Sequence, residues 1–79
     1  MKLYAVRNGD GDIQDFRVAP NADDALADHM EETGLAEDDT DDFTVDDWSK
    51  FAAEMKNEDG EPVTVDLTKR GFVGFGPDA

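Results

Sequence analysis

A β-hairpin is predicted by residues 2–18, KLYAVRNGDGDIQDFRV, and the other predicted elements pack around it. Two strand-like segments, Lys2–Arg7 and Asp12–Val18, flank the dipeptides Asn8-Gly9 and Asp10-Gly11. Both dipeptides accept the positive φ values that a tight hairpin turn demands, so either one fits the turn.

Side-chain alternation in this hairpin predicts one wall of the hydrophobic core. Successive residues of a strand point to opposite faces of the sheet. Tyr4 and Val6 therefore share a face of the first strand, and Phe16 and Val18 share a face of the second.

Two further strands are predicted near the C-terminus. Residues 62–68, PVTVDLT, alternate strictly, with Val63, Val65 and Leu67 toward the core, and form the clearest strand pattern in the chain. Residues 71–76, GFVGFG, are a candidate for a short fourth strand, although glycine weakens strand formation.

The first helix is predicted over residues 22–33. Asn21 is a good N-cap residue, and Gly34 suits the left-handed position that follows a helix. The helix carries a narrow stripe of mostly small apolar residues at helical spacing: Ala22, Ala25, Leu26, His29 and Met30.

A second helix is predicted after a polar loop at residues 37–42. Thr44 is expected to cap it, and Phe43 is expected to pack against Trp48. Its apolar stripe is Val45, Trp48, Phe51, Ala52 and Met55, and residues 57–60 end it.

The predicted order is therefore ββααβ with a further short strand, a single α+β domain over residues 1–79. A small antiparallel sheet of three or four strands has both helices on one face.

Composition excludes several classes of function. The chain has 79 residues, 21 of them Asp or Glu against 7 Lys or Arg, and a formal charge of −14. A protein that binds nucleic acid directly needs a basic surface, which this composition does not supply. There is no Cys for a disulfide or a thiolate site, and no apolar run near the roughly 20 residues of a membrane span. We therefore expect a cytoplasmic protein that binds neither nucleic acid nor membrane.

Catalytic, cofactor and metal sites are not expected. His29 is the only histidine and Ser49 the only serine, and they fall on separate predicted helices. His29 is expected to lie partly exposed beside the apolar stripe. Residues 8–12 resemble the start of a calcium-binding EF-hand loop, but Ile13 replaces the glycine of the sharp turn and Ala19 replaces the final glutamate.

The negative charge is concentrated in the middle of the chain. Residues 1–22 hold three acids and three bases, and residues 62–79 hold two of each, so both ends are neutral. Residues 23–61 hold 16 acids against two lysines, and residues 23–47 hold 12 acids and no base. Like charges at i,i+3 and i,i+4 on the first helix destabilise it when no basic partner is present. An arrangement kept against this cost calls for an explanation other than the stability of the helix.

Three interpretations of the acidic block remain open: a solvated face that keeps the protein soluble, adaptation to high salt, and a surface that binds a strongly basic partner. Clustering favours the third, because salt adaptation would spread the acids over the whole surface and a merely soluble surface would mix both signs. Twelve carboxylates equal the charge of roughly 20 Å of duplex DNA. The candidate partner-binding residues are Asp23, Asp24, Asp28, Glu31, Glu32, Glu37, Asp38, Asp39, Asp41, Asp42, Asp46 and Asp47.

In size, single-domain build, lack of Cys and acidic block, the chain resembles the small phage-encoded DNA-mimic inhibitors of bacterial defence, of the anti-CRISPR and anti-restriction type. The resemblance is to a class and not to a sequence motif. It implies a viral inhibitor that works by protein–protein interaction, without cofactor or turnover. We expect a monomer, or a weak dimer through the exposed edge of the small sheet. The implied partner is a basic nucleic-acid-binding protein, such as a subunit of a CRISPR surveillance complex. A general protein-interaction module and a halophile-type acidic domain are the alternatives.

Overall fold

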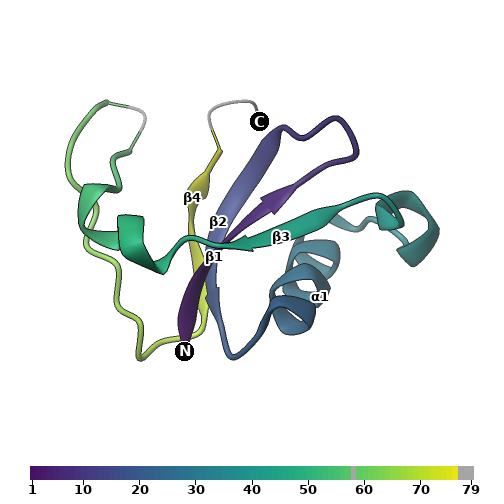
Figure 1. The fold of residues 1–79 in the computed structure, drawn as a ribbon, viewed down its shortest axis with the longest axis horizontal. Coiled ribbons are helices and arrows are strands. Elements are labelled where there is room, and N and C mark those ends of the chain that lie inside the picture. The colour runs from purple at the N-terminus through teal and green to yellow at the C-terminus, as the bar shows by residue number, and fades with distance from the viewer. Residues whose placement is uncertain (58, 77–79) are drawn as a thin grey trace.

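A four-stranded antiparallel sheet is the centre of the fold (Figure 1). The computed structural model describes residues 1–57 and 59–76. In this part of the chain the elements are β1 (Lys2–Arg7), β2 (Ile13–Ala19), α1 (Ala22–Thr33), the 3-10 helix η1 (Glu37–Thr40), β3 (Thr44–Asp47), the 3-10 helix η2 (Ser49–Glu54) and β4 (Gly71–Phe75). The strands lie in the order β3-β1-β2-β4, so the predicted hairpin forms the two central strands. The predicted α+β class is confirmed.

The register of the hairpin corrects the predicted core wall. Leu3 pairs with Val18 and Ala5 pairs with Phe16, so these four side chains share one face of the sheet. Tyr4 lies on the opposite face, in a second cluster. The hairpin therefore supplies a wall to two apolar layers, because the pairing register decides which residues of two strands face the same side.

The two faces of the sheet are covered by different segments (Figure 1). Helix α1 packs on one face, where Ala25 joins Tyr4 and Ala19. On the other face, Trp48, Ala52, Met55, Val65 and Leu67 cover the Leu3 cluster. The prediction of two helices on one face is wrong, because the hairpin has apolar side chains on both faces and each face needs a cover.

Helix α1 forms as predicted. The side chain of Asn21 accepts a hydrogen bond from the backbone N–H of Asp24 at 2.9 Å, which satisfies a free donor of the first turn. Gly34 has a φ of 74°, and its N–H donates to the carbonyl of Met30. A left-handed residue that donates back in this way ends a helix.

The predicted second helix is wrong in its first part. Residues 44–47 form strand β3, in which Val45 pairs with Val6 and Asp47 pairs with Tyr4. Thr44 is therefore not a cap: the short helix η2 begins at Ser49, with Trp48 at its N-cap position and no capping hydrogen bond from that side chain. The carboxylate of Asp47 accepts from the backbone N–H of Ser49. Pairing with the open edge of β1 outweighs the weak helical preference of this short segment.

Phe43 does not form the predicted staple with Trp48. Its ring lies 5.7 Å from the ring of His29, whereas Trp48 makes tilted ring contacts with Phe16 and Phe51. Residues 37–42, predicted as a loop, contain the single turn of η1.

The predicted strand at residues 62–68 is also wrong as a sheet member. Val63, Val65 and Leu67 are partly buried and alternate with exposed residues, so the burial pattern is correct. However, only Pro62 makes a bridge, to Lys56, and the segment runs over one face of the sheet. Alternating burial requires an extended chain on an apolar surface, but it does not require a hydrogen-bonded neighbour. The predicted short strand near residue 71 is confirmed as β4, which is an edge strand.

Candidate functional site

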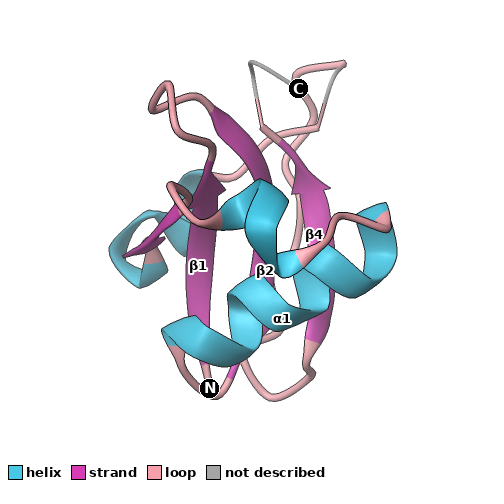
Figure 2. Ribbon diagram, turned by 90° about the vertical axis from the view of Figure 1, so that its right-hand side faces the viewer, coloured by secondary structure: helices cyan, strands magenta, loops and turns pink. Residues whose placement is uncertain are grey.

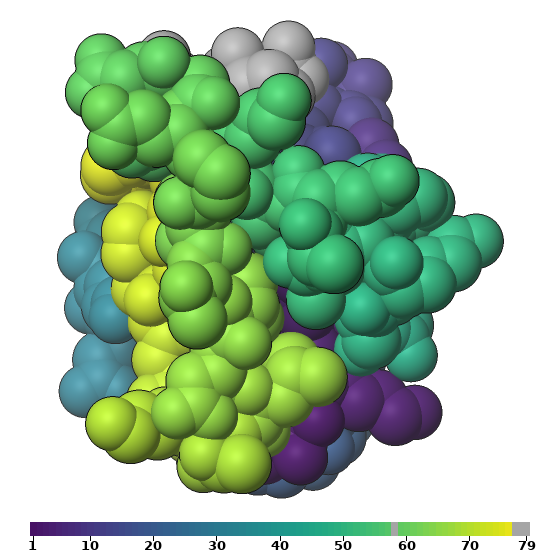
Figure 3. All heavy atoms as spheres, turned by 90° about the vertical axis from the view of Figure 1, so that its left-hand side faces the viewer, coloured from purple at the N-terminus to yellow at the C-terminus, as the bar shows by residue number. Residues whose placement is uncertain are grey.

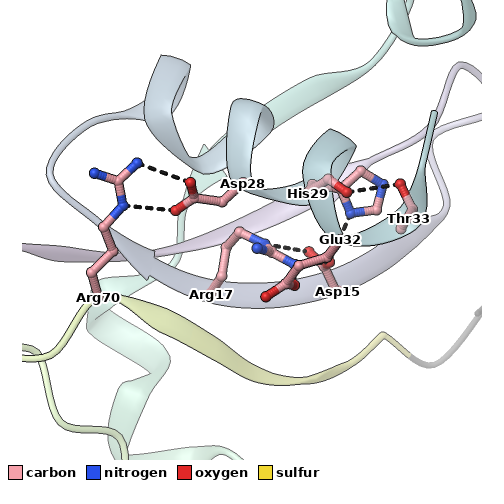
Figure 4. A network of polar contacts seen from close by, with 7 residues as sticks. All are labelled: Asp15, Arg17, Asp28, His29, Glu32, Thr33 and Arg70. Carbon is pink, nitrogen blue, oxygen red and sulfur yellow. Dashed lines mark hydrogen bonds and ion pairs between the residues drawn. The ribbon is translucent and has the colours of Figure 1, made fainter. Parts of the chain in front are cut away.

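A buried polar network links β2 to α1 (Figure 4). Asp15 and Arg17 point to the same side of β2 and are 3% and 1% exposed. The Arg17 Nη2 atom donates to Asp15 Oδ2 and to Glu32 Oε2, both at 2.6 Å. His29 Nδ1 lies 2.7 Å from Asp15 Oδ2. The prediction that His29 is partly exposed is wrong, because this residue is 3% exposed and faces the sheet.

The charge state of Asp15 follows from its partners. Burial raises the pKa of this carboxyl group, but the hydrogen bonds from His29 and Arg17 outweigh burial and hold the pKa below its usual value. Asp15 is therefore ionised, and the His29 Nδ1–H donates to it. Burial lowers the pKa of Arg17, while the hydrogen bonds to Asp15 and Glu32 raise it, and the net shift is upward. The network thus holds a buried cation between two carboxylates.

A second ion pair joins α1 to the start of β4. Arg70 donates through Nε and Nη2 to the two carboxylate oxygens of Asp28, at 2.8 and 2.9 Å (Figure 4). The hydrogen bond from Arg70 lowers the pKa of Asp28. Arg70 Nη1 also lies 4.0 Å from Asp24. The expectation that the acids of the first helix have no basic partner is therefore wrong for Asp24, Asp28 and Glu32. Their partners, Arg17 and Arg70, come from β2 and from the segment before β4.

Five of the twelve candidate acids are ion-paired, and the partners come from distant parts of the chain. Besides the three acids on α1, Asp46 pairs with Arg7 at 2.6 Å and Asp47 pairs with Lys2 at 3.7 Å. The guanidinium of Arg7 also lies over the ring of Trp48, so Asp46 belongs to the face of the sheet opposite α1. The twelve acids therefore do not all share one surface.

The other seven acids make no ion pair within residues 1–57 and 59–76, and all seven are exposed. They lie on α1, on η1 and just after η1, on the side of the molecule that faces the viewer in Figure 2. We call them the acidic face: Asp23, Glu31, Glu37, Asp38, Asp39, Asp41 and Asp42.

The acidic face is held together by contacts between η1 and α1. Thr40, which is 4% exposed, lies with its hydroxyl 3.0 Å from the sulfur of Met30. The ring of Phe43 contacts the ring of His29 at a tilt of 45°, and this contact holds the far end of the same segment. The buried Thr40 thus holds η1 against α1, and with it the exposed acids that precede and follow Thr40 in the chain.

Sequence reasoning missed an extension of the acidic face. The carboxylate of Asp42 lies against Gly9 so closely that a Cβ atom there would collide with it. The hairpin turn therefore touches the acidic face and brings Asp10 and Asp12, both exposed, to its border. Both acids belong to residues 1–22, whose net charge is zero, so the distribution of charge along the sequence did not point to them.

The buried network was also missed, although its signal is present in the sequence. Asp15 and Arg17 are two residues apart on a predicted strand, so they share a face, and a charged pair on one face of a central strand requires a partner above it. His29 is the only residue of the helical stripe that could hydrogen-bond to a carboxylate there.

The arrangement of polar groups constrains what chemistry is available. His29 and Ser49 lie on opposite sides of the sheet, and the Ser49 hydroxyl accepts a hydrogen bond from the Leu3 N–H. Among the described residues, no group of three or more His, Asp or Glu side chains is placed to hold a metal ion. None of the helices in the described ranges is long and apolar enough to cross a membrane.

Comparison with known protein families, with curated proteins and with solved structures yields no match to this chain.

Proposed function

We propose that this protein is an inhibitor that binds the basic DNA-binding surface of a CRISPR or restriction effector and blocks recognition of target DNA by mimicking it. In this proposal it is a phage protein acting in the cytoplasm of the host bacterium. The observation that carries the proposal is the acidic face. Four of the seven basic residues pair with other acids, yet the seven carboxylates of the acidic face, on α1, on η1 and just after η1, stay exposed and unpaired within the described chain.

The size of the acidic face sets the expected footprint. Duplex DNA carries one charge per about 1.7 Å of axis, so seven carboxylates match roughly 12 Å of duplex. This is shorter than the length derived from twelve acids, because five acids are engaged inside the protein. Such a face would cover a short element of the effector, for example the site that reads a few base pairs, rather than a whole channel. Electrostatic steering would make its association fast and sensitive to salt.

The proposal is tested by competition on purified DNA-targeting effectors. Binding of labelled target duplex to a CRISPR surveillance complex and to a restriction enzyme is measured while this protein is added. Displacement at near-stoichiometric amounts that weakens with added salt is expected from at least one of them. If no effector loses its duplex, the proposal fails.

A charge-reversal pair locates the surface. Asp38→Lys combined with Asp41→Lys should abolish inhibition, since both residues lie on the acidic face. Asp59→Lys combined with Glu61→Lys makes the same change of charge at two exposed acids away from α1 and η1, and should leave most of the inhibition intact. Equal losses from both pairs would show that only the overall charge matters.

A further inference from the structure

Strand β4 is an open edge of the sheet. Within residues 1–57 and 59–76 it pairs only with β2, so one row of its backbone N–H and C=O groups has no partner strand there. Proteins usually protect such edges with charged side chains or proline. The opposite edge, β3, carries Asp46 and Asp47, whereas residues 71–75 contain neither an ionisable group nor proline. The edge at β4 is therefore open to an added strand.

Two exposed aromatic rings stand on this edge. The register shifts between Phe16 and Arg17, so Phe72 pairs with Arg17 while Phe75 pairs with Asp15. Because Arg17 and Asp15 share a face, the shift places both phenylalanines on that same face, with ring centroids 5.0 Å apart. They are 43% and 67% exposed. An exposed aromatic pair on an edge strand is typical of an interaction surface.

The end of α1 gives this edge a negative border. Figure 2 shows that the C-terminal end of the helix projects beyond β4, and Figure 3 shows blue atoms of α1 extending past the yellow atoms of β4 from the other side. The last turn of α1 contains no base. It carries Glu31, which is exposed and unpaired within the described chain, and Glu32, whose side chain is 51% exposed while it holds Arg17.

The opposite face of β4 borders a hollow with a mixed lining. Val18, Val63 and Val73 line this cavity of about 230 Å³ together with the polar residues Thr64, Asp66, Lys69 and Arg70. A strand added to β4 points alternate side chains to the two faces. One set would meet the phenylalanine rings and the glutamates, and the other set would meet the three valines in the hollow.

We propose that the β4 edge binds an extended segment of a partner protein in which basic and apolar residues alternate. The backbone of the segment would pair with β4. Its lysine or arginine stems would cross the rings of Phe72 and Phe75 and reach Glu31, and its apolar side chains would enter the hollow. A second copy of this chain fits less well, because a two-fold pairing of β4 with itself brings two α1 ends, and hence two sets of glutamates, together on the same face of the sheet. This site shares only Glu31 with the acidic face and does not depend on the proposed function.

The test uses the full chain, labelled with ¹⁵N, and a synthetic octapeptide that alternates lysine with valine. Binding is followed by NMR chemical shifts and by amide hydrogen exchange. We expect shifts and slower exchange at β4. The same peptide with glutamate in place of lysine, or with alternate backbone nitrogens methylated, should not bind.

Single substitutions in the protein test which side chains contribute to peptide binding. Phe75→Ala should weaken peptide binding at least about fivefold, whereas Leu35→Ala, at an exposed residue beyond the end of α1, should not change it. Glu31→Gln should weaken it about two- to fivefold at low salt.

Three results would overturn the inference: shifts confined to α1 and η1, equal binding of the methylated peptide, or a dimer of the free protein that Phe75→Ala dissociates. Because the probe is a peptide and not a DNA-binding effector, failure here leaves the duplex competition test unaffected.

Discussion

Replacing Asp15 with asparagine tests whether the buried network stabilises the fold. The change keeps the shape of the side chain and removes its charge. Arg17 and His29, 1% and 3% exposed, then lose their carboxylate acceptor. At 2.6 Å and an effective dielectric constant near 20, the Asp15–Arg17 attraction is roughly 6 kcal/mol. Part of it is offset by the cost of burying the carboxylate.

The expected net loss in the free energy of unfolding is about 3–5 kcal/mol, as for other buried pairs from which one partner is removed. Glu32 still contacts Arg17, but it is half exposed and replaces Asp15 only in part. A domain of this length has roughly 4–12 kcal/mol of stability in total. The variant should therefore be marginally folded at room temperature.

The assay is urea unfolding at neutral pH followed by Trp48 fluorescence, with Asp12→Asn as the matched control. Asp12 is exposed in the hairpin turn, so its replacement should change stability by less than about 0.5 kcal/mol. A loss below about 1 kcal/mol for Asp15→Asn would refute the argument that its charge is needed. Replacing the pair together, Asp15→Leu with Arg17→Met, should cost less than Asp15→Asn alone, because no buried cation is then left behind.

Three further predictions concern acid, packing and salt. The pKa values of Asp15 and Asp28 lie below 3.8 in the folded protein. Their ionised forms therefore stabilise the fold fully above that pH, and this contribution is lost as the pH falls through the folded pKa values. The urea midpoint should drop at low pH, and it should drop less steeply in Asp15→Asn. Gly76→Ala should destabilise by about 1–3 kcal/mol in thermal unfolding, because a Cβ atom there collides with the carbonyl of Ile13, whereas Gly74→Ala, which meets no neighbour, should be nearly neutral. Since five of the twelve acids in the block are ion-paired, the protein should melt cooperatively in dilute buffer; folding only in molar salt would favour halophilic adaptation instead.

Local signals predicted the elements that depend on local interactions. The hairpin and α1 each have turn or cap residues at both ends, such as Asn21 and Gly34, and their bounds were predicted to within about one residue. Residues 44–47 and 62–68 were assigned wrongly because both segments are short. Whether such a segment forms a helix, a paired strand or an extended stretch packed on a sheet depends on which sheet edge or face is available. That information lies in the pairing of other segments.

For the candidate site, composition predicted the excess of acids but not their arrangement. Arg70 lies 42 positions from Asp28 and Arg17 lies 15 from Glu32, so pattern analysis along one helix could not pair them. Likewise, Phe72 and Phe75 share a face only because the register shifts between β2 and β4.

By itself, the sequence determined the class of the fold, the hairpin, the first helix and the total charge, since each follows from residue types that act within a few positions of one another. Only the tertiary structure decided which acids are neutralised, that His29 is buried against Asp15, and that an aromatic edge lies beside the last turn of α1. Charges and rings act through space, and their distances are set by strand order and register, which no single segment of the chain contains.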